Sequence, residues 1–162
     1  MSNTLIKGCV NNVTFHSNEQ FVHHKLLDGI YIAGTYDALR STGNGNFTLR
    51  DYKSAATKPS SFSNDYRMQL HSYAYALKKQ HNITVDTIEL EYVTRPTKTL
   101  PCRHFHFSEP FTSDDFDKIE SQLLTVAHSV KLWKSNPELR FALAQDYRLK
   151  LVEKPKLFKD KP

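Results

Sequence analysis

The sequence has few cysteines and no long hydrophobic run, and both absences narrow the class of protein. Its two cysteines among 162 residues, Cys9 and Cys102, form no metal-binding or disulfide motif. No stretch approaches the roughly 20 apolar residues that a membrane helix needs. The opening segment MSNTLIKGCVNNVTF lacks the apolar core and cleavage site of a signal peptide. We therefore expect no membrane association, reduced thiols and a cytoplasmic location.

The composition is that of an ordinary soluble domain with a mild excess of positive charge. The hydrophobic content is 39% and the charged content is 24%, and the formal net charge is +5. This charge is compatible with a polyanionic partner but does not identify one. There is no internal repeat. The length predicts a single domain over residues 1–150, followed by a basic C-terminal tail over residues 151–162.

Hydrophobic periodicity predicts an α/β fold in which helices flank a central mixed β-sheet. The expected strands are 20–27, 30–39, 47–55, 87–95 and 102–107, and the expected helices are 65–80, 112–133 and 136–150. A tight Asp28-Gly29 turn joins the first two strands, and a Gly- and Asn-rich loop over 41–46 precedes the third. The apolar stripe of helix 112–133 is expected to pack on the core; it consists of Phe116, Ile119, Leu123, Val126, Val130 and Trp133.

Two carboxylates and a lysine lie in the second and third expected strands. Asp51 and Lys53 are two residues apart and therefore face the same side of a strand. If the two strands form a hairpin, Asp37 lies beside Asp51 and faces the same way. Their mutual repulsion would be removed by a divalent cation, for which Mg²⁺ is the natural choice and Mn²⁺ a substitute. The backbone carbonyl of Tyr52 could add a third oxygen ligand, and Lys53 would then stand beside the attacking water of a phosphate-directed hydrolytic site.

Other readings of these residues remain open at this point. Asp51 and Lys53 alone could form a surface ion pair. Gln69 and Tyr73 share the inward face of helix 65–80, where the Gln69 amide could bind either the water of the metal or a phosphate oxygen. Cys102, His104 and His106 share one face of a strand and suggest zinc. However, the first and last of these positions lie roughly 13 Å apart on a strand, so one ion cannot hold all three.

Three segments, GTYDAL, LRDYKSA and QLHSYAYAL, resemble the RecB-like branch of the PD-(D/E)XK nuclease superfamily. The branch pattern is G-x-x-D, then D-x-K followed by Thr or Ser, then Q-x-x-x-Y. The segment that follows Lys53 is also similar to mitochondrial genome maintenance exonucleases and phage exonucleases. The resemblance implies a restriction-endonuclease-like core. It implies Asp37 and Asp51 as metal ligands, Lys53 as the catalytic lysine, and Gln69 and Tyr73 as supporting residues.

The resemblance also implies an activity: Mg²⁺-dependent exonucleolytic hydrolysis of DNA, single-stranded or at duplex ends, in recombination, repair or processing. A bacterial or phage-infected cell would be its setting. No cysteine follows Cys102, so we expect no iron–sulfur cluster. Family members carry a further Glu or His upstream of the site; here Glu19, His16, His23 or His24 could take that place. The alternative is a nuclease-fold module that binds nucleic acid or a protein partner without cutting, and an oligomer is also possible.

Overall fold

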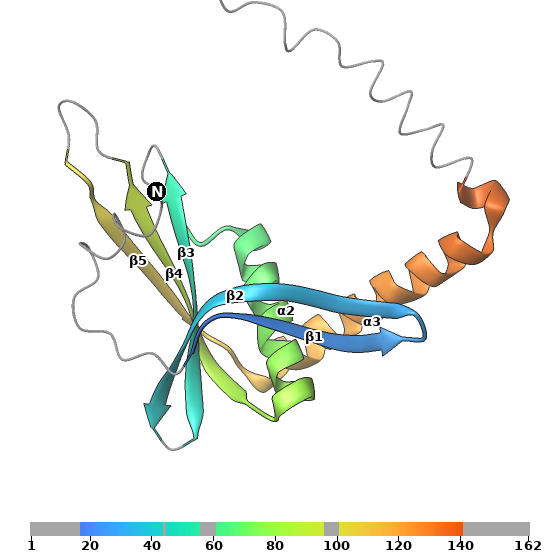
Figure 1. Cartoon of the computed structure of the whole chain (residues 1–162), viewed down its shortest axis with the longest axis horizontal. Helices are drawn as coiled ribbons and strands as arrows, with labels where there is room; N and C mark the ends of the chain where they lie inside the picture. Colours follow the sequence, from blue (N-terminus) through green and yellow to red (C-terminus); the bar gives the residue numbers. More distant parts are fainter. Residues whose placement is uncertain (1–16, 44, 56–60, 96–100, 141–162) are drawn as a thin grey trace, which may run out of the picture.

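The computed structural model describes residues 17–43, 45–55, 61–95 and 101–140 (Figure 1). A sheet of five strands has the spatial order β1-β2-β3-β4-β5, with β3 and β4 parallel and the other neighbours antiparallel. The elements in chain order are β1 (Ser17–Leu27), β2 (Ile30–Gly43), β3 (Asn46–Ala55), α2 (Asn64–His81), β4 (Thr84–Thr94), β5 (His104–Pro110) and α3 (Ser113–Ser135). The predicted α/β class, a mixed sheet flanked by helices, is confirmed.

The core lies between the sheet and α2, which is the crossover that connects the parallel strands β3 and β4. α2 packs against β1, β2, β3 and β4, and α3 packs against α2 and the β1–β2 hairpin. The largest fully buried side chains are aliphatic: Val22, Leu39, Leu49, Leu70, Leu77, Ile88, Leu90 and Ile119. Burial of these residues supplies the main driving force for this arrangement.

Strand β2 changes partner along its length, and this change positions the residues of interest. Its pairs with β1 run from Ile30 to Leu39, and its pairs with β3 run from Ala38 to Gly43. The β1–β2 hairpin therefore extends to one side of the molecule, while β3 and β4 run in another direction (Figure 1). We call the place where β2 leaves β3, at Asp37 and Asp51, the fork.

The loop predicted over 41–46 is mostly strand, which corrects the sequence-based boundary. Ser41 pairs with Phe47 and Gly43 pairs with Asn46, so the strands continue almost to the turn. Gly45 has a φ of 79°, a conformation that glycine adopts at little cost in a tight turn. The Gly- and Asn-rich composition therefore marks a short hairpin turn, as Asp28-Gly29 does between β1 and β2, where Gly29 has a φ of 68°.

The helix starts follow from local capping. The Ser63 side chain accepts from the Tyr66 N–H at the start of α2. At α3, Thr112 and Asp115 form a reciprocal capping box, as expected from an N-cap at Thr112. A helical turn also begins after Asn136, whose side chain accepts from the Leu139 N–H. The rest of the predicted helix 136–150 and the tail 151–162 lie outside the described residues.

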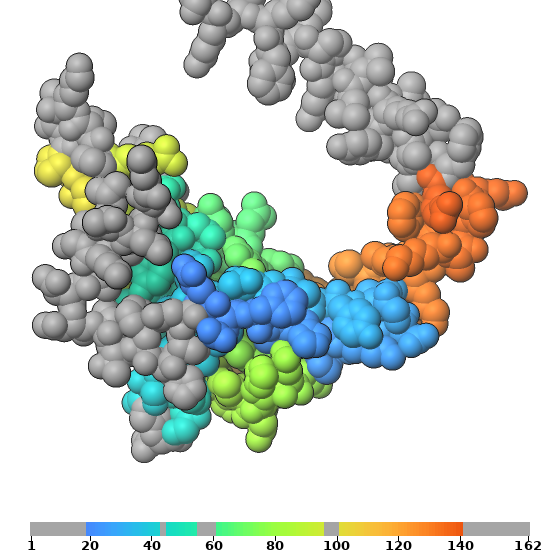
Figure 2. All heavy atoms as spheres, viewed as in Figure 1, coloured from blue at the N-terminus to red at the C-terminus, as the bar shows by residue number. Residues whose placement is uncertain are grey.

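The predicted burial of the α3 stripe is wrong for its C-terminal half. Ile119 is buried and Phe116 packs against the core, but Val126 is 59% exposed and Trp133 is 41% exposed. The far end of α3 projects beyond the sheet (Figure 1; Figure 2), and where α3 packs on the β1–β2 hairpin it buries Ala127, 1% exposed, rather than its neighbour Val126. Neither α2 nor α3, the two long helices of the described region, has the length and apolarity to cross a membrane.

Candidate active site

Asp37 and Asp51 meet at the fork. Ala38 pairs with Arg50, so the next step along these antiparallel strands places Asp37 opposite Asp51. The backbone ladder between β2 and β3 stops here, and the N–H of Tyr52 donates instead to the Oδ2 of Asp37 at 2.7 Å. The Asp37 carboxylate therefore bridges the two strands where they separate, and it lies against the D-x-K segment of β3.

Asp51 is buried and forms a close ion pair with the lysine that follows it. Its side chain is 4% exposed, and the Nζ of Lys53 lies 2.6 Å from its Oδ2. Apart from this ammonium, the buried Oδ2 has no hydrogen-bond donor among the described residues. A buried carboxylate oxygen with so few donors is costly. This oxygen is thus a position where a cation would be stabilising.

The electrostatics of Asp51 agree with this geometry. Burial raises its pKa from the ordinary 3.8 to about 6; the nearby Lys53 ammonium opposes this shift, and the Asp37 carboxylate adds to it. Two carboxylates therefore share a poorly hydrated place with a single ammonium. A divalent cation between hard oxygen ligands would relieve both the burial cost and the repulsion. Asp37 and Asp51 thus fit a metal of this kind.

Helix α2 lies directly against the fork. The Nε2 of Gln69 donates to the hydroxyl of Tyr73 at 3.1 Å. The Tyr73 ring packs on the bare backbone of Gly34, where an added Cβ would lie 2.5 Å from the Tyr73 Cε1. The glycine of the G-x-x-D segment thus allows a close approach of helix and strand. The contact thus joins Gln69 and Tyr73 of α2 to Gly34 of β2, three residues before Asp37 on that strand.

Two tyrosines that the sequence analysis did not assign to the site surround Lys53. The Nζ of Lys53 lies 4.9 Å from the ring centroid of Tyr66, and the Tyr66 ring meets the Tyr92 ring edge-on with centroids 6.1 Å apart. Tyr92 is also the partner of Lys53 in the parallel β3–β4 ladder. Tyr66 precedes Gln69 by three residues and so shares its helix face, which was the one available sequence signal.

The upstream candidates lie at different distances from the fork. Asn18 pairs with Ala38 and Gln20 with Tyr36, so the register places Glu19 across from Asp37. The Glu19 side chain is exposed. His23 and His24 instead contact the C-terminal half of α2, because the His23 N–H donates to the Gln80 side chain and the His24 ring meets Tyr75. His16 lies outside the described residues.

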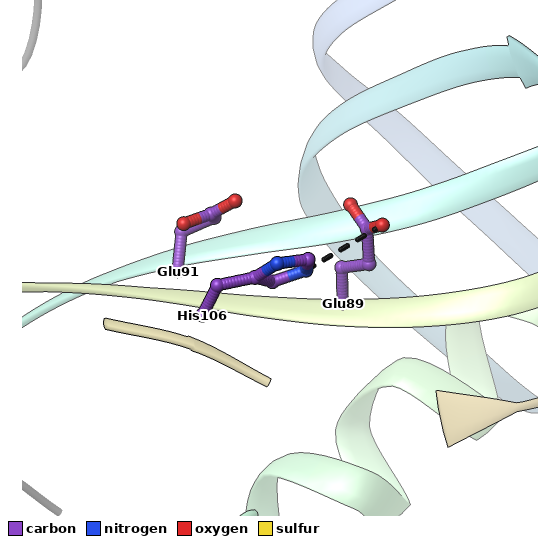
Figure 3. Close-up of side chains that lie close together, drawn as sticks. All are labelled: Glu89, Glu91 and His106. Atoms are coloured by element: carbon purple, nitrogen blue, oxygen red, sulfur yellow. Dashed lines mark ion pairs between the residues drawn. The ribbon is translucent and has the colours of Figure 1, made fainter. Parts of the chain in front are cut away.

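A second group of potential ligands lies on β4 and β5. One ligand atom each from Glu89, Glu91 and His106 lies within 4.8 Å of the others (Figure 3), and His106 pairs with Glu91 across the strands. Alternation places Arg50, their partner on β3, on the opposite face from its neighbour Asp51. This group is thus a candidate metal site by residue type, separate from the fork.

The two carboxylates of this second group already have an arginine and two histidines as partners. Arg50 donates from Nε to Glu89 at 2.8 Å, and its Nη1 lies 3.3 Å from Glu91. His106 lies 3.5 Å from Glu89, and His104 bonds Glu91. A guanidinium already occupies the space between the two carboxylates. At the fork, by contrast, Asp37 and Asp51 share the single ammonium of Lys53.

Comparison with known proteins gives a match to one protein family. The profile described as "PD-(D/E)XK nuclease superfamily" matches residues 9–146. No curated protein matches the sequence. A solved protein named SSO0001 is similar with a TM-score of 0.47 and 16% identity, over 75% of this chain and 51% of that one. A candidate exonuclease from Eubacterium rectale is similar with a TM-score of 0.42 and 12% identity, over 67% of this chain and 41% of that one. The chain thus spans about half the length of these two structures, or less.

Proposed function

The chain belongs to the PD-(D/E)XK nuclease superfamily, and on this basis we propose that it is a divalent-metal-dependent nuclease that hydrolyses DNA phosphodiester bonds from an end. The observation that carries the proposal is the meeting of Asp37, Asp51 and Lys53 at the fork, where two carboxylates, one of them buried, share a single ammonium. The RecB-like pattern of three motifs supports the choice of DNA and of exonucleolytic cutting.

Asp37 and Asp51 would hold the metal through their carboxylates, and the carbonyl of Tyr52, between Asp51 and Lys53, would add a neutral oxygen. Mg²⁺ suits such a set of hard oxygen ligands, and Mn²⁺ would substitute. When bound, the cation supplies Lewis acidity at the scissile phosphate and a low-pKa water. The N–H of Tyr52 fixes Asp37 at 2.7 Å and so sets the ligand geometry before any metal arrives.

Lys53 would act on the reacting groups themselves. Its ammonium lies 2.6 Å from Asp51, so a phosphate drawn to a metal on Asp51 would come within its reach. From there it orients the attacking water and stabilises the negative charge that grows on the phosphate oxygens. Gln69 supports the same centre, because its amide has donors and an acceptor beyond the bond to Tyr73 and can bind a water or a phosphate oxygen.

A digestion assay tests this function. Labelled DNA is offered in four forms, linear or circular and single- or double-stranded, with Mg²⁺, with Mn²⁺ or with a chelator. We expect both metals to support loss of label from linear DNA, and circular DNA to survive. Cleavage of circular DNA would make the protein an endonuclease. The same assay with Asp51→Asn controls for contaminating nucleases, because that variant should be inactive.

A binding module without catalysis is the second candidate. The observation in its favour is the small number of carboxylate ligands at the fork. Among the described residues, the contacts at the fork supply the carboxylates of Asp37 and Asp51, and the only upstream candidate placed opposite them, Glu19, is exposed. A Mg²⁺ titration separates the two functions. Cleavage that rises with Mg²⁺ supports the enzyme, whereas tight DNA binding without cleavage at any metal concentration supports the module.

A further inference from the structure

We propose that Tyr66 is a positioning residue for Lys53: its ring face keeps the ammonium at the fork when Asp51 gives its carboxylate to a metal. This inference rests on the proposed function for its catalytic consequence. Its structural part, the contact between the Lys53 side chain and the Tyr66 ring, stands independently. Tyr66 is not part of the three-motif pattern.

The two anchors of Lys53 differ in how they respond to a cation. The first is the carboxylate of Asp51, 2.6 Å from Nζ, and the second is the Tyr66 ring, whose centroid lies 4.9 Å from Nζ. A dication held by Asp51 would compete with the ammonium for the same oxygens and repel it. The ring has no such competition, because its attraction for a cation comes from the negative face of the π-system.

Without a second anchor, Lys53 would have an open path away from the site. Its side chain is 24% exposed, and its flexible four-carbon stem allows the ammonium to swing into water. A catalytic contribution requires the charge within hydrogen-bonding reach of the reacting phosphate. Tyr66 would restrict the ammonium to the space between its ring and the fork.

Tyr66 is itself fixed from two sides. Its ring meets Tyr92 edge-on at an interplanar angle of 71°. It sits in the first turn of α2, and the next residue, Arg67, anchors that turn to β5 through two bonds of 2.7 Å to the Glu109 carboxylate. Burial, with the neighbouring Tyr66 as the next cause, raises the pKa of Tyr92 to about 12, so Tyr92 adds no competing negative charge at neutral pH.

Nuclear magnetic resonance of the whole chain labelled with ¹³C at lysine tests the contact, without any need for activity. The Lys53 Hε signal, assigned through Lys53→Arg, should be displaced upfield by the ring current, and it should stay displaced when Mg²⁺ is added. Tyr66→Leu should abolish the displacement. Lys79, whose Nζ lies 5.4 Å from the centroid of the Tyr75 ring, is an internal control. Its signal should not move when Mg²⁺ is added or when Tyr66 is replaced. An undisplaced Lys53 signal in the original protein, with or without Mg²⁺, would overturn the proposal.

Single-turnover cleavage at saturating DNA and Mg²⁺ tests the catalytic consequence. We expect Tyr66→Leu to lower the rate about tenfold, the order of a partly desolvated cation–π contact, with little change in DNA affinity. Tyr66→Phe should retain most of the rate. Replacement by pentafluorophenylalanine, which keeps the ring shape but reverses its electrostatics, should lose it. Tyr31→Leu, which changes an exposed tyrosine in the β1–β2 hairpin, is the matched control.

The outcomes separate the two claims. Equal rates for the phenylalanine and pentafluorophenylalanine variants, with equal melting temperatures, would show that Tyr66 is only a packing residue and would overturn the positioning role. If the original protein cuts no DNA with any metal, the proposed function fails. The resonance experiment then still decides whether Tyr66 holds Lys53 in the presence of Mg²⁺.

Discussion

The backbone N–H of Tyr52 donates to the carboxylate of Asp37 at 2.7 Å, in place of a backbone bond between β2 and β3. One carboxylate thus closes the gap between two diverging strands and is aimed at the other carboxylate, Asp51. The bond also holds the Asp37 carboxylate beside Tyr52, the middle residue of the D-x-K segment. Both consequences distinguish the fork from an ordinary cluster of surface carboxylates.

We expect Asp51→Asn to abolish cleavage and, without metal, to melt at the same temperature as the original protein or a few degrees higher at pH 8. The pKa of Asp51 is raised to about 6 in the folded chain, against 3.8 as the ordinary value. Its ionisation therefore costs native-state stability as the pH rises from about 4 to about 6, and the cost persists above that range. Thermal melts of both proteins at pH 4 and pH 8 check this, since the advantage of Asn should disappear at pH 4. Full activity of this variant would contradict the site.

We expect Lys53→Ala to lower the rate at saturating DNA by about 10²–10³-fold, the usual value of one transition-state donor. DNA affinity and its salt dependence should barely change. Lys53→Arg should not restore the rate, because a planar guanidinium does not match an ammonium on a flexible stem. Lys79→Ala is the control for the loss of one positive charge. If Lys53→Ala instead weakens binding by one phosphate contact and cleaves normally, its role is only electrostatic attraction.

We expect Gln69→Ala to weaken catalysis while shifting the melting temperature by no more than a few degrees. Gln69 is only partly buried, and its one described bond, to the Tyr73 hydroxyl at 3.1 Å, does not hold the core together. Specific activity and thermal melts, measured on the same preparation, check both halves. A large loss of stability with unchanged specific activity would make Gln69 a structural residue.

We expect Gly34→Ala to destabilise the fold by about 1–3 kcal/mol, the usual cost of overpacking. The added Cβ would lie 2.5 Å from the Tyr73 ring, so the ring must move. Tyr73→Leu in the same chain should recover part of this loss, because the smaller side chain leaves room for the methyl group. Urea unfolding of both single variants and of the double variant gives the coupling. Additive effects would show that the close contact is absent in solution.

We expect the metal to bind at the fork and not at the second group on β4 and β5. Asp37→Asn should abolish Mn²⁺ binding, measured by electron paramagnetic resonance, whereas His106→Asn should leave it unchanged. The reason is that Arg50 and two histidines already contact Glu89 and Glu91, whereas Asp37 and Asp51 share the single ammonium of Lys53. The opposite pattern of the two variants would move the metal to the second group.

Features that depend on residues close together in the chain could be predicted from the amino-acid sequence. Asp51 and Lys53 lie side by side because strand side chains alternate, and Gln69 and Tyr73 meet because helical residues four apart are neighbours. The Thr112 cap is equally local. The order of strands and helices followed from hydrophobic periodicity, which reports burial residue by residue.

Contacts between remote segments could not be predicted in this way, because they depend on how the elements pack together. The close packing of Tyr73 on Gly34 and of Tyr66 on Lys53 depends on how α2 lies across the sheet. The exposure of Val126 beside the buried Ala127 depends on which side of α3 the β1–β2 hairpin covers, although its place in the apolar stripe predicted burial. Periodicity states which face of an element is apolar. It cannot state how far a neighbouring layer extends, because that is set by the packing of all the elements together.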